Sequence, residues 1–163
     1  MNRTKKLVTL SVVVALAMVL SYLEHLIPPP PVPGIKLGLA NIAVVFALYK
    51  LGLFEAGIIS VVRVILSSVL FGSTVSFWYA IAGATVSLVL MILIKSFTPL
   101  NAITVSTVGA ISHNLAQIGV ACILFDTNII VYYLPFLLIS GTVAGIVIGT
   151  AGAMLVKRVK FKW

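Results

Sequence analysis

Several hydrophilic side chains lie inside long apolar stretches of this sequence. Arg63, His113 and Gln117 each interrupt a run of mainly aliphatic residues. An ionisable side chain near the centre of a bilayer costs at least about 2.5–3.5 kcal/mol on insertion scales, so it usually faces a cavity or a partner. The planar fork of donors on Arg63 suits a carboxylate or a phosphate. This residue set therefore predicts binding of an anionic or oxygen-rich small molecule.

Counting along the expected helices places these polar residues at similar depths. At a rise of 1.5 Å per residue, Arg63 and Gln117 lie about 12 Å below the outer surface, and Asn41 lies about 9 Å below it. His113 and Gln117 are four residues apart and share a helix face, whereas Asn114 is offset by about 100°. The predicted substrate-binding residues are Glu24, His25, Lys36, Asn41, Arg63, Trp78, His113, Asn114 and Gln117.

Each of these residues also has a purely structural interpretation. Arg63 can pair with Glu24 and hold the bundle together, because pairing is a common way to tolerate a charge in the membrane. His113 can be a satisfied structural histidine. Trp78 lies near an outer helix end, where aromatic residues commonly anchor at the interface, although it can also stack on a ligand. The convergence of several polar residues is a stronger indication than any one of them.

The composition shows which elements must position these residues. Of the 163 residues, 61% are hydrophobic and 9% are charged, whereas about a quarter of the residues of a soluble domain are charged. A bilayer is therefore the expected solvent. Crossing a hydrocarbon core of about 30 Å takes about 20 helical residues, so six crossings use about 120. We expect an all-α integral membrane protein with a single six-helix transmembrane domain over residues 1–163.

The apolar runs and their punctuation locate six helices. Prolines and a glycine at 28–34 make a stiff, non-helical connection after the first of them. An amino terminus inside the cell places most of the eleven basic residues on the cytoplasmic side, as the positive-inside rule requires. We therefore expect a plasma-membrane protein with both termini in the cytoplasm, and the net charge of +8 reflects topology rather than nucleic-acid binding. The predicted helices span residues 7–27, 35–49, 53–71, 75–94, 102–125 and 129–156.

Small residues recur at four-residue spacing on two of these helices. Gly141, Gly145 and Gly149 predict that the last helix packs closely inside the bundle, because glycine lets another backbone approach. On the first helix, the same spacing fits either packing within the bundle or contact with a helix of a partner subunit. The predicted partner-helix contacts are Ser11, Ala15, Ala17 and Ser21.

Some chemistry is excluded by what the chain lacks. It has one aspartate and two glutamates, well separated in sequence, so it has no aspartate-rich Mg²⁺ site of the kind that holds a diphosphate. It has no phosphate-binding loop for ATP hydrolysis. Its histidines and acidic residues have no metal-ligand spacing. We expect a protein that is not an enzyme and needs no metal or cofactor.

Four stretches of the chain carry a family resemblance, at residues 21–28, 33–42, 63–66 and 113–117. They resemble the Gx transporter family, which is also catalogued as heptaprenyl diphosphate synthase component I. The resemblance covers essentially the whole chain, with Ala116 as a mild departure because the family favours glycine there. It implies a six-helix fold similar to the S components of energy-coupling factor (ECF) transporters.

In that transporter group, the S component captures a vitamin or similar micronutrient from outside the cell. A separate transmembrane coupling protein and two ATPase subunits then drive import. The resemblance implies that the loop at 28–34, with Lys36 just beyond it, closes over a small-molecule substrate, and that small residues on the first helix meet the coupling protein within the lipid. The alternative is a non-catalytic membrane component associated with a prenyl-diphosphate synthase or a quinone pathway.

Overall fold

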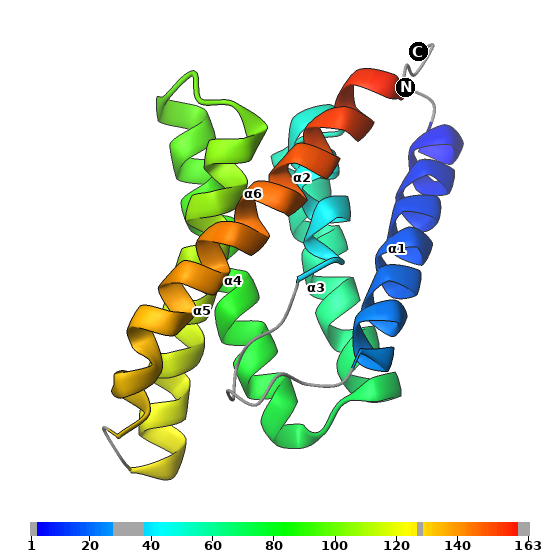
Figure 1. The fold of residues 1–163 in the computed structure, drawn as a ribbon. Helices are drawn as coiled ribbons and strands as arrows, with labels where there is room; N and C mark the ends of the chain where they lie inside the picture. The colour runs from blue at the N-terminus through cyan, green and yellow to red at the C-terminus, as the bar shows by residue number, and fades with distance from the viewer. Residues whose placement is uncertain (1–2, 28–37, 127–128, 160–163) are drawn as a thin grey trace.

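The computed structural model describes residues 3–27, 38–126 and 129–159. These residues form six α-helices and one short 3-10 helix, without strands (Figure 1). Lys36, predicted to bind substrate, and the predicted loop at 28–34 lie outside the described residues. The helices are α1 (Arg3–Leu26), α2 (Asn41–Lys50), α3 (Leu53–Phe71), α4 (Thr74–Phe97), α5 (Ala102–Phe125), η1 (Ile129–Tyr133) and α6 (Leu134–Arg158).

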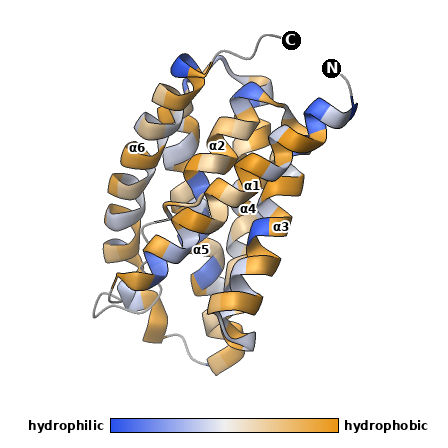
Figure 2. Ribbon diagram, turned by 90° about the vertical axis from the view of Figure 1, so that its right-hand side faces the viewer, coloured by the Kyte–Doolittle hydropathy of each residue, from blue (hydrophilic) through white to orange (hydrophobic). Residues whose placement is uncertain are grey.

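Five helical segments within the described residues are long and apolar enough to cross a membrane. They are α1, α3, α4, α5 and the continuous segment formed by η1 and α6. Figure 2 shows that hydrophobic residues make up most of the length of these helices. Phe54, Val69 and Phe97 are all more than 70% exposed, which is unfavourable in water but favourable in lipid. The fold is therefore that of an all-helical, multi-pass membrane protein.

The second helix differs from its prediction. A crossing was expected over 35–49, but α2 begins at Asn41 and has ten residues, which span about 15 Å. Gly38 adopts a left-handed conformation with φ +70°, and the turn that follows it delays the start of the helix. Figure 1 shows this start near the middle height of the bundle. The described residues thus contain five helical segments of spanning length, where the sequence predicted six.

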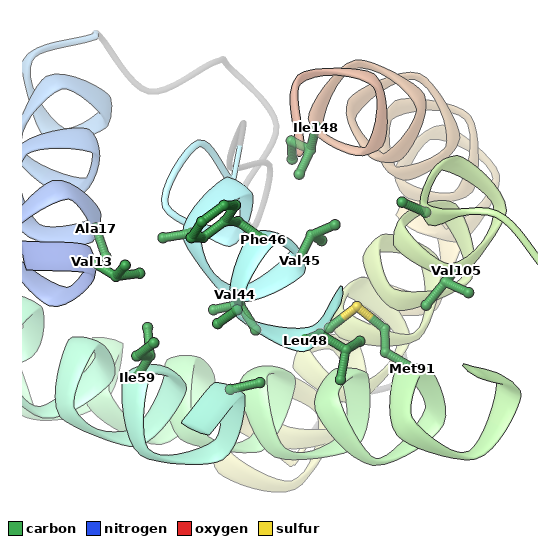
Figure 3. Packing of buried hydrophobic residues seen from close by; sticks show 14 residues of the cluster. Val13, Ala17, Val44, Val45, Phe46, Leu48, Ile59, Met91, Val105 and Ile148 are labelled. Carbon is green, nitrogen blue, oxygen red and sulfur yellow. The ribbon is translucent and has the colours of Figure 1, made fainter. Parts of the chain in front are cut away.

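The short helix α2 lies among the others. It contacts α1, α3, α5 and α6, while α3 packs on α4 and α4 on α5. Its residues from Ala43 to Leu48 are all buried, as expected for a helix that is apolar on every side. In Figure 3, Val44 and Leu48 lie between Ile59 of α3 and Met91 of α4. This core fixes the inner surfaces of α3, α4 and α5, which carry the polar residues.

Polar contacts hold one end of the bundle, at which α1 begins and α6 ends (Figure 1). Lys6 of α1 forms an ion pair with Glu55 at the start of α3. Lys95 of α4 donates a hydrogen bond to the backbone oxygen of Leu48 near the end of α2, where a cation is favoured by the helix dipole. We call this end, with Lys6, Lys95 and Arg158, the basic end.

The predicted close packing of the last helix is confirmed. A Cβ atom added to Gly145 would lie 2.5 Å from the Cα atom of Thr107, and one added to Gly149 would lie 2.6 Å from the Cα atom of Ile103. The backbone of α6 therefore rests directly on the backbone of α5. This contact sets the position of α5, which carries His113 and Gln117.

Candidate functional site

Arg63 lies on the inward face of α3. It is one helical turn beyond Ile59, which is fully buried in the core, and it lies farther from the basic end. Its Nε atom is buried and has no hydrogen-bond partner in the described part of the chain. A guanidinium has five N–H donors, and leaving a buried charged group incompletely bonded is costly. Arg63 is thus a cation inside the bundle with a donor still available.

Glu24 is the acidic residue whose charge interacts with Arg63. Within the described residues, however, the two side chains form no direct ion pair. The Oε1 atom of Glu24 instead accepts a hydrogen bond of 2.6 Å from the backbone N–H of Gly38. The structural alternative, a direct Arg63–Glu24 ion pair, is therefore absent from the described residues. Glu24 attracts Arg63 from a distance while it holds the turn before α2.

His113 and Gln117 occupy neighbouring turns of α5. The imidazole of His113 lies against Gly83 of α4, because a Cβ atom there would be 2.7 Å from its Cε1 atom. Gln117 is 5% exposed, and its Oε1 atom has no hydrogen-bond partner among the described residues. An unpaired buried carbonyl oxygen is costly. Gln117 therefore offers an unused acceptor inside the protein.

The connection between α3 and α4 relates these residues to Arg63. Arg63 lies nine residues before Gly72, and Gly83 lies ten residues after Ser73, so both are about 15 Å from this connection at 1.5 Å per residue. Because α3 packs on α4 and His113 touches Gly83, Arg63 and His113 lie at similar levels. Gln117 lies one turn closer to the α3–α4 connection.

Asn114 points to a different neighbour. Its Nδ2 atom donates a hydrogen bond of 2.8 Å to the backbone oxygen of Leu137 in α6. The same atom lies close to Gly141, because a Cβ atom added there would be 2.8 Å from it. Its side chain, 8% exposed, thus joins α5 to α6. The substrate-binding role of Asn114 stays a prediction, whereas its packing role is visible in the structure.

Replacing Asn114 with alanine is expected to destabilise the protein by about 1 kcal/mol, because interhelical hydrogen bonds in membranes contribute about 0.6–2 kcal/mol. Thermal unfolding in detergent measures this change. The matched control is Ser140→Ala, because Ser140 donates to the same Leu137 oxygen from within α6. An equal loss of stability in both variants would show that the contact between α5 and α6 contributes nothing of its own.

The remaining predicted site residues lie apart from this group or at its edge. Trp78 is 54% exposed on the first turns of α4 and packs edge-on against Phe77 with ring centroids 5.6 Å apart. His25 is exposed and stacks on Phe71 at 5.8 Å. Asn41 is the half-buried first residue of α2. The structure thus relates Glu24 to Arg63, and His113 to Gln117, but leaves Trp78 outside.

The small residues of α1 do not share one environment. Ser11 and Ala15 are exposed, whereas Ala17 is fully buried and points into the core in Figure 3. Ser21 is half-buried. The exposed pair is where a partner helix can make contact, and Ala17 serves the packing of α1 in its own bundle.

Sequence reasoning missed three residues of this region. Gly38 supplies the N–H bound by Glu24, and Gly83 leaves room for the ring of His113. Ser87, one turn from Gly83, is 1% exposed, and its hydroxyl oxygen is unpartnered within the described ranges. The only advance signal for Gly83 is its place between Ala82 and Ala84, where small residues favour close helix packing. No cluster of three or more metal-ligating side chains occurs in the described residues.

The comparisons with known proteins bear on the family of the chain. No curated protein and no solved structure matches it. The family described as heptaprenyl diphosphate synthase component I matches residues 13–155. This range includes Glu24, Arg63, His113 and Gln117, and it reaches all six α-helices. The chain therefore belongs to the heptaprenyl diphosphate synthase component I family.

Proposed function

We propose that this protein is the substrate-binding subunit of an importer of the energy-coupling factor type. It takes a small organic molecule with an anionic or oxygen-rich group from the outer side of the membrane. The observation that carries this proposal is the guanidinium of Arg63, which lies inside an apolar bundle with a buried donor unpaired in the described residues. A ligand carboxylate or phosphate supplies the missing acceptor, because its oxygens match the donor fork of arginine.

A second unused group supports a ligand of mixed polarity. The Oε1 atom of Gln117 accepts no hydrogen bond in the described residues. It lies one turn from the level that His113 and Arg63 share. A ligand that presents an anionic group to Arg63 and an N–H or O–H donor to Gln117 would satisfy both. The proposed protein performs no chemistry on this ligand and uses no cofactor.

The proposal includes a topology and a location. The proposed topology has six helices of the S-component type, in which α2 is the short second one. Lys6, Lys95 and Arg158 at the basic end favour the cytoplasmic side for both termini in the plasma membrane. The opposite end, at which α3 meets α4, is then the outer one. Arg63 and Gln117 are reached from that side.

The proposed partners are a transmembrane coupling protein and ATPase subunits, since this chain has no phosphate-binding loop of its own. Ser11 and Ala15 form the proposed contact with a coupling-protein helix, because they are small and exposed on α1 and small residues allow helices to approach closely. The two residues are four apart and therefore lie on one face.

A second candidate function follows from the family description. Its name specifies one component of a heptaprenyl diphosphate synthase, which implies a partner enzyme component. Under this alternative, the chain is a non-catalytic membrane partner of a prenyl-diphosphate synthase. It then purifies with a soluble synthase and stimulates that enzyme.

Native mass spectrometry of gently extracted protein distinguishes the two functions. A substrate-binding subunit is expected to carry a small polar molecule and to retain a coupling protein with ATPases. A synthase partner is expected to retain a soluble, aspartate-rich enzyme and no small molecule in the bundle. Recovery of the chain with neither a small molecule nor an ATPase would contradict the importer proposal.

A further inference from the structure

Glu24 is placed where it competes with any anion that approaches Arg63. Its carboxylate is directed to the backbone N–H of Gly38, three residues before α2 begins. The start of a helix carries a partial positive charge, so this position suits an anion. The charge of Glu24 also interacts with Arg63. One carboxylate thus serves both positive groups.

Arg63 is left incompletely satisfied by this arrangement. It has no direct ion pair with Glu24 in the described residues, and its Nε atom is buried without an acceptor in the same part of the chain. A carboxylate committed wholly to Arg63 would remove this cost. Glu24 instead accepts the N–H of Gly38, so the Nε donor of Arg63 stays without an acceptor among the described residues.

We propose that Glu24 is an internal counter-ion that an anionic ligand group competes with, and that it thereby sets the strength of anion binding at Arg63. This inference rests on the proposed function, since it assigns a role to a residue of the same site. Without ligand, Glu24 balances the charge of Arg63. When a ligand anion binds Arg63, two negative charges lie near one cation and repel each other.

Removing a competing counter-ion changes the affinity for an anion in the opposite direction to removing an ordinary binding residue. A glutamate that accepts hydrogen bonds from the ligand strengthens binding, and its removal weakens binding. A competing counter-ion weakens anion binding, and its neutralisation strengthens it. Glu24→Gln tests the sign cleanly, because glutamine keeps an oxygen that can accept the N–H of Gly38 but carries no charge.

Acetate is a suitable probe because it reproduces the carboxylate group. The full chain is placed in nanodiscs of neutral lipid, and its Tm is measured in sodium acetate and in sodium chloride of equal ionic strength. An anion that binds only the folded protein raises the Tm. At an acetate concentration ten times the Kd of the Glu24→Gln variant, acetate is expected to raise the Tm of this variant by about 3 °C relative to chloride. The wild type is expected to change by less than about 1 °C.

Three further variants assign the effect to the pair of Glu24 and Arg63. The double variant Glu24→Gln with Arg63→Met is expected to lose the acetate response, because no cation remains at the site. Tyr22→Phe, two residues earlier on α1, changes no charge and keeps the ring that contacts Phe71, and it is expected to behave as the wild type. Glu24→Ala also frees the N–H of Gly38 and is expected to respond more strongly than Glu24→Gln. If the alanine variant does not fold, the glutamine variant decides the test.

The inference is overturned if acetate does not raise the Tm of Glu24→Gln, if it raises that of the wild type equally, or if the rise persists without Arg63. Its failure is separate from failure of the proposed function. The importer proposal fails when the native protein carries neither a small molecule nor an ATPase, even if acetate raises the Tm of Glu24→Gln as expected. The counter-ion role fails when acetate does not raise the Tm of Glu24→Gln, even if the native protein carries a ligand whose binding depends on Arg63.

Discussion

Arg63→Met is expected to lower the affinity for the small molecule that purifies with the wild-type protein about 100-fold. A hydrogen bond to a charged group contributes about 1.5–3 kcal/mol, and 3 kcal/mol corresponds to a factor of about 100 in Kd. Stability is expected to be unchanged or raised, because an apolar side chain of similar length often replaces a buried charge without loss. The measurements are ligand load by native mass spectrometry and Tm on the same preparation.

The two readouts separate a ligand-binding arginine from a structural one. If Arg63 only holds the bundle together, the methionine variant loses stability and keeps its ligand load. Arg63→Lys is expected to be intermediate, because lysine keeps the charge but not the planar fork. Ser67→Ala is the matched control, since Ser67 lies one turn farther on α3 and bonds within its own helix to Val64. It should retain full load.

Local signals predicted some helices closely. Residues 53–71 and 102–125 were predicted and coincide with α3 and α5. Each begins at a residue whose type stops or caps a helix: Gly52, with φ +141°, precedes α3, and the side chain of Asn101 accepts the N–H of Thr104 at the start of α5. Such signals lie within a few residues of the boundary and can be read without tertiary structure.

The start of α2 depends on a distant contact and was predicted wrongly. The hydrogen bond between Gly38 and Glu24 joins residues fourteen apart, and the left-handed backbone at Gly38 belongs to the turn that this contact holds. The apolar pattern of the sequence continues through this position. A sequence pattern therefore predicts an apolar helix here but not its length.

The sequence predicted how deep the site residues lie in the membrane, but not which neighbouring helix each side chain faces. Counting residues placed Arg63, His113 and Gln117 at related levels, because the rise of a helix is constant. The same counting cannot tell which face of α5 turns to α4 and which to α6. Asn114 turns to Leu137 of α6, although it adjoins His113 in sequence. The facing was decided by Gly83 and Gly141, whose lack of side chains admits the larger neighbours.

Gly149→Ala is expected to destabilise the bundle strongly. The added Cβ atom would lie 2.6 Å from the Cα atom of Ile103 and 2.9 Å from the Cβ atom of Ser106. Neither neighbour is the end of a flexible side chain, so α5 and α6 must separate. Overpacking of this kind costs about 1–3 kcal/mol or more. We expect a Tm at least about 4 °C below that of the wild type.

Gly119→Ala is the matched control, because Gly119 lies on α5 and an added Cβ atom would meet nothing within 4 Å. Alanine favours a helix over glycine by about 1 kcal/mol, so this control is expected to keep or raise the Tm. An equal loss in both variants would mean that the helix contact does not govern stability. Because the same contact positions α5, Gly149→Ala should also reduce ligand load through His113 and Gln117, although Gly149 lies several turns from both.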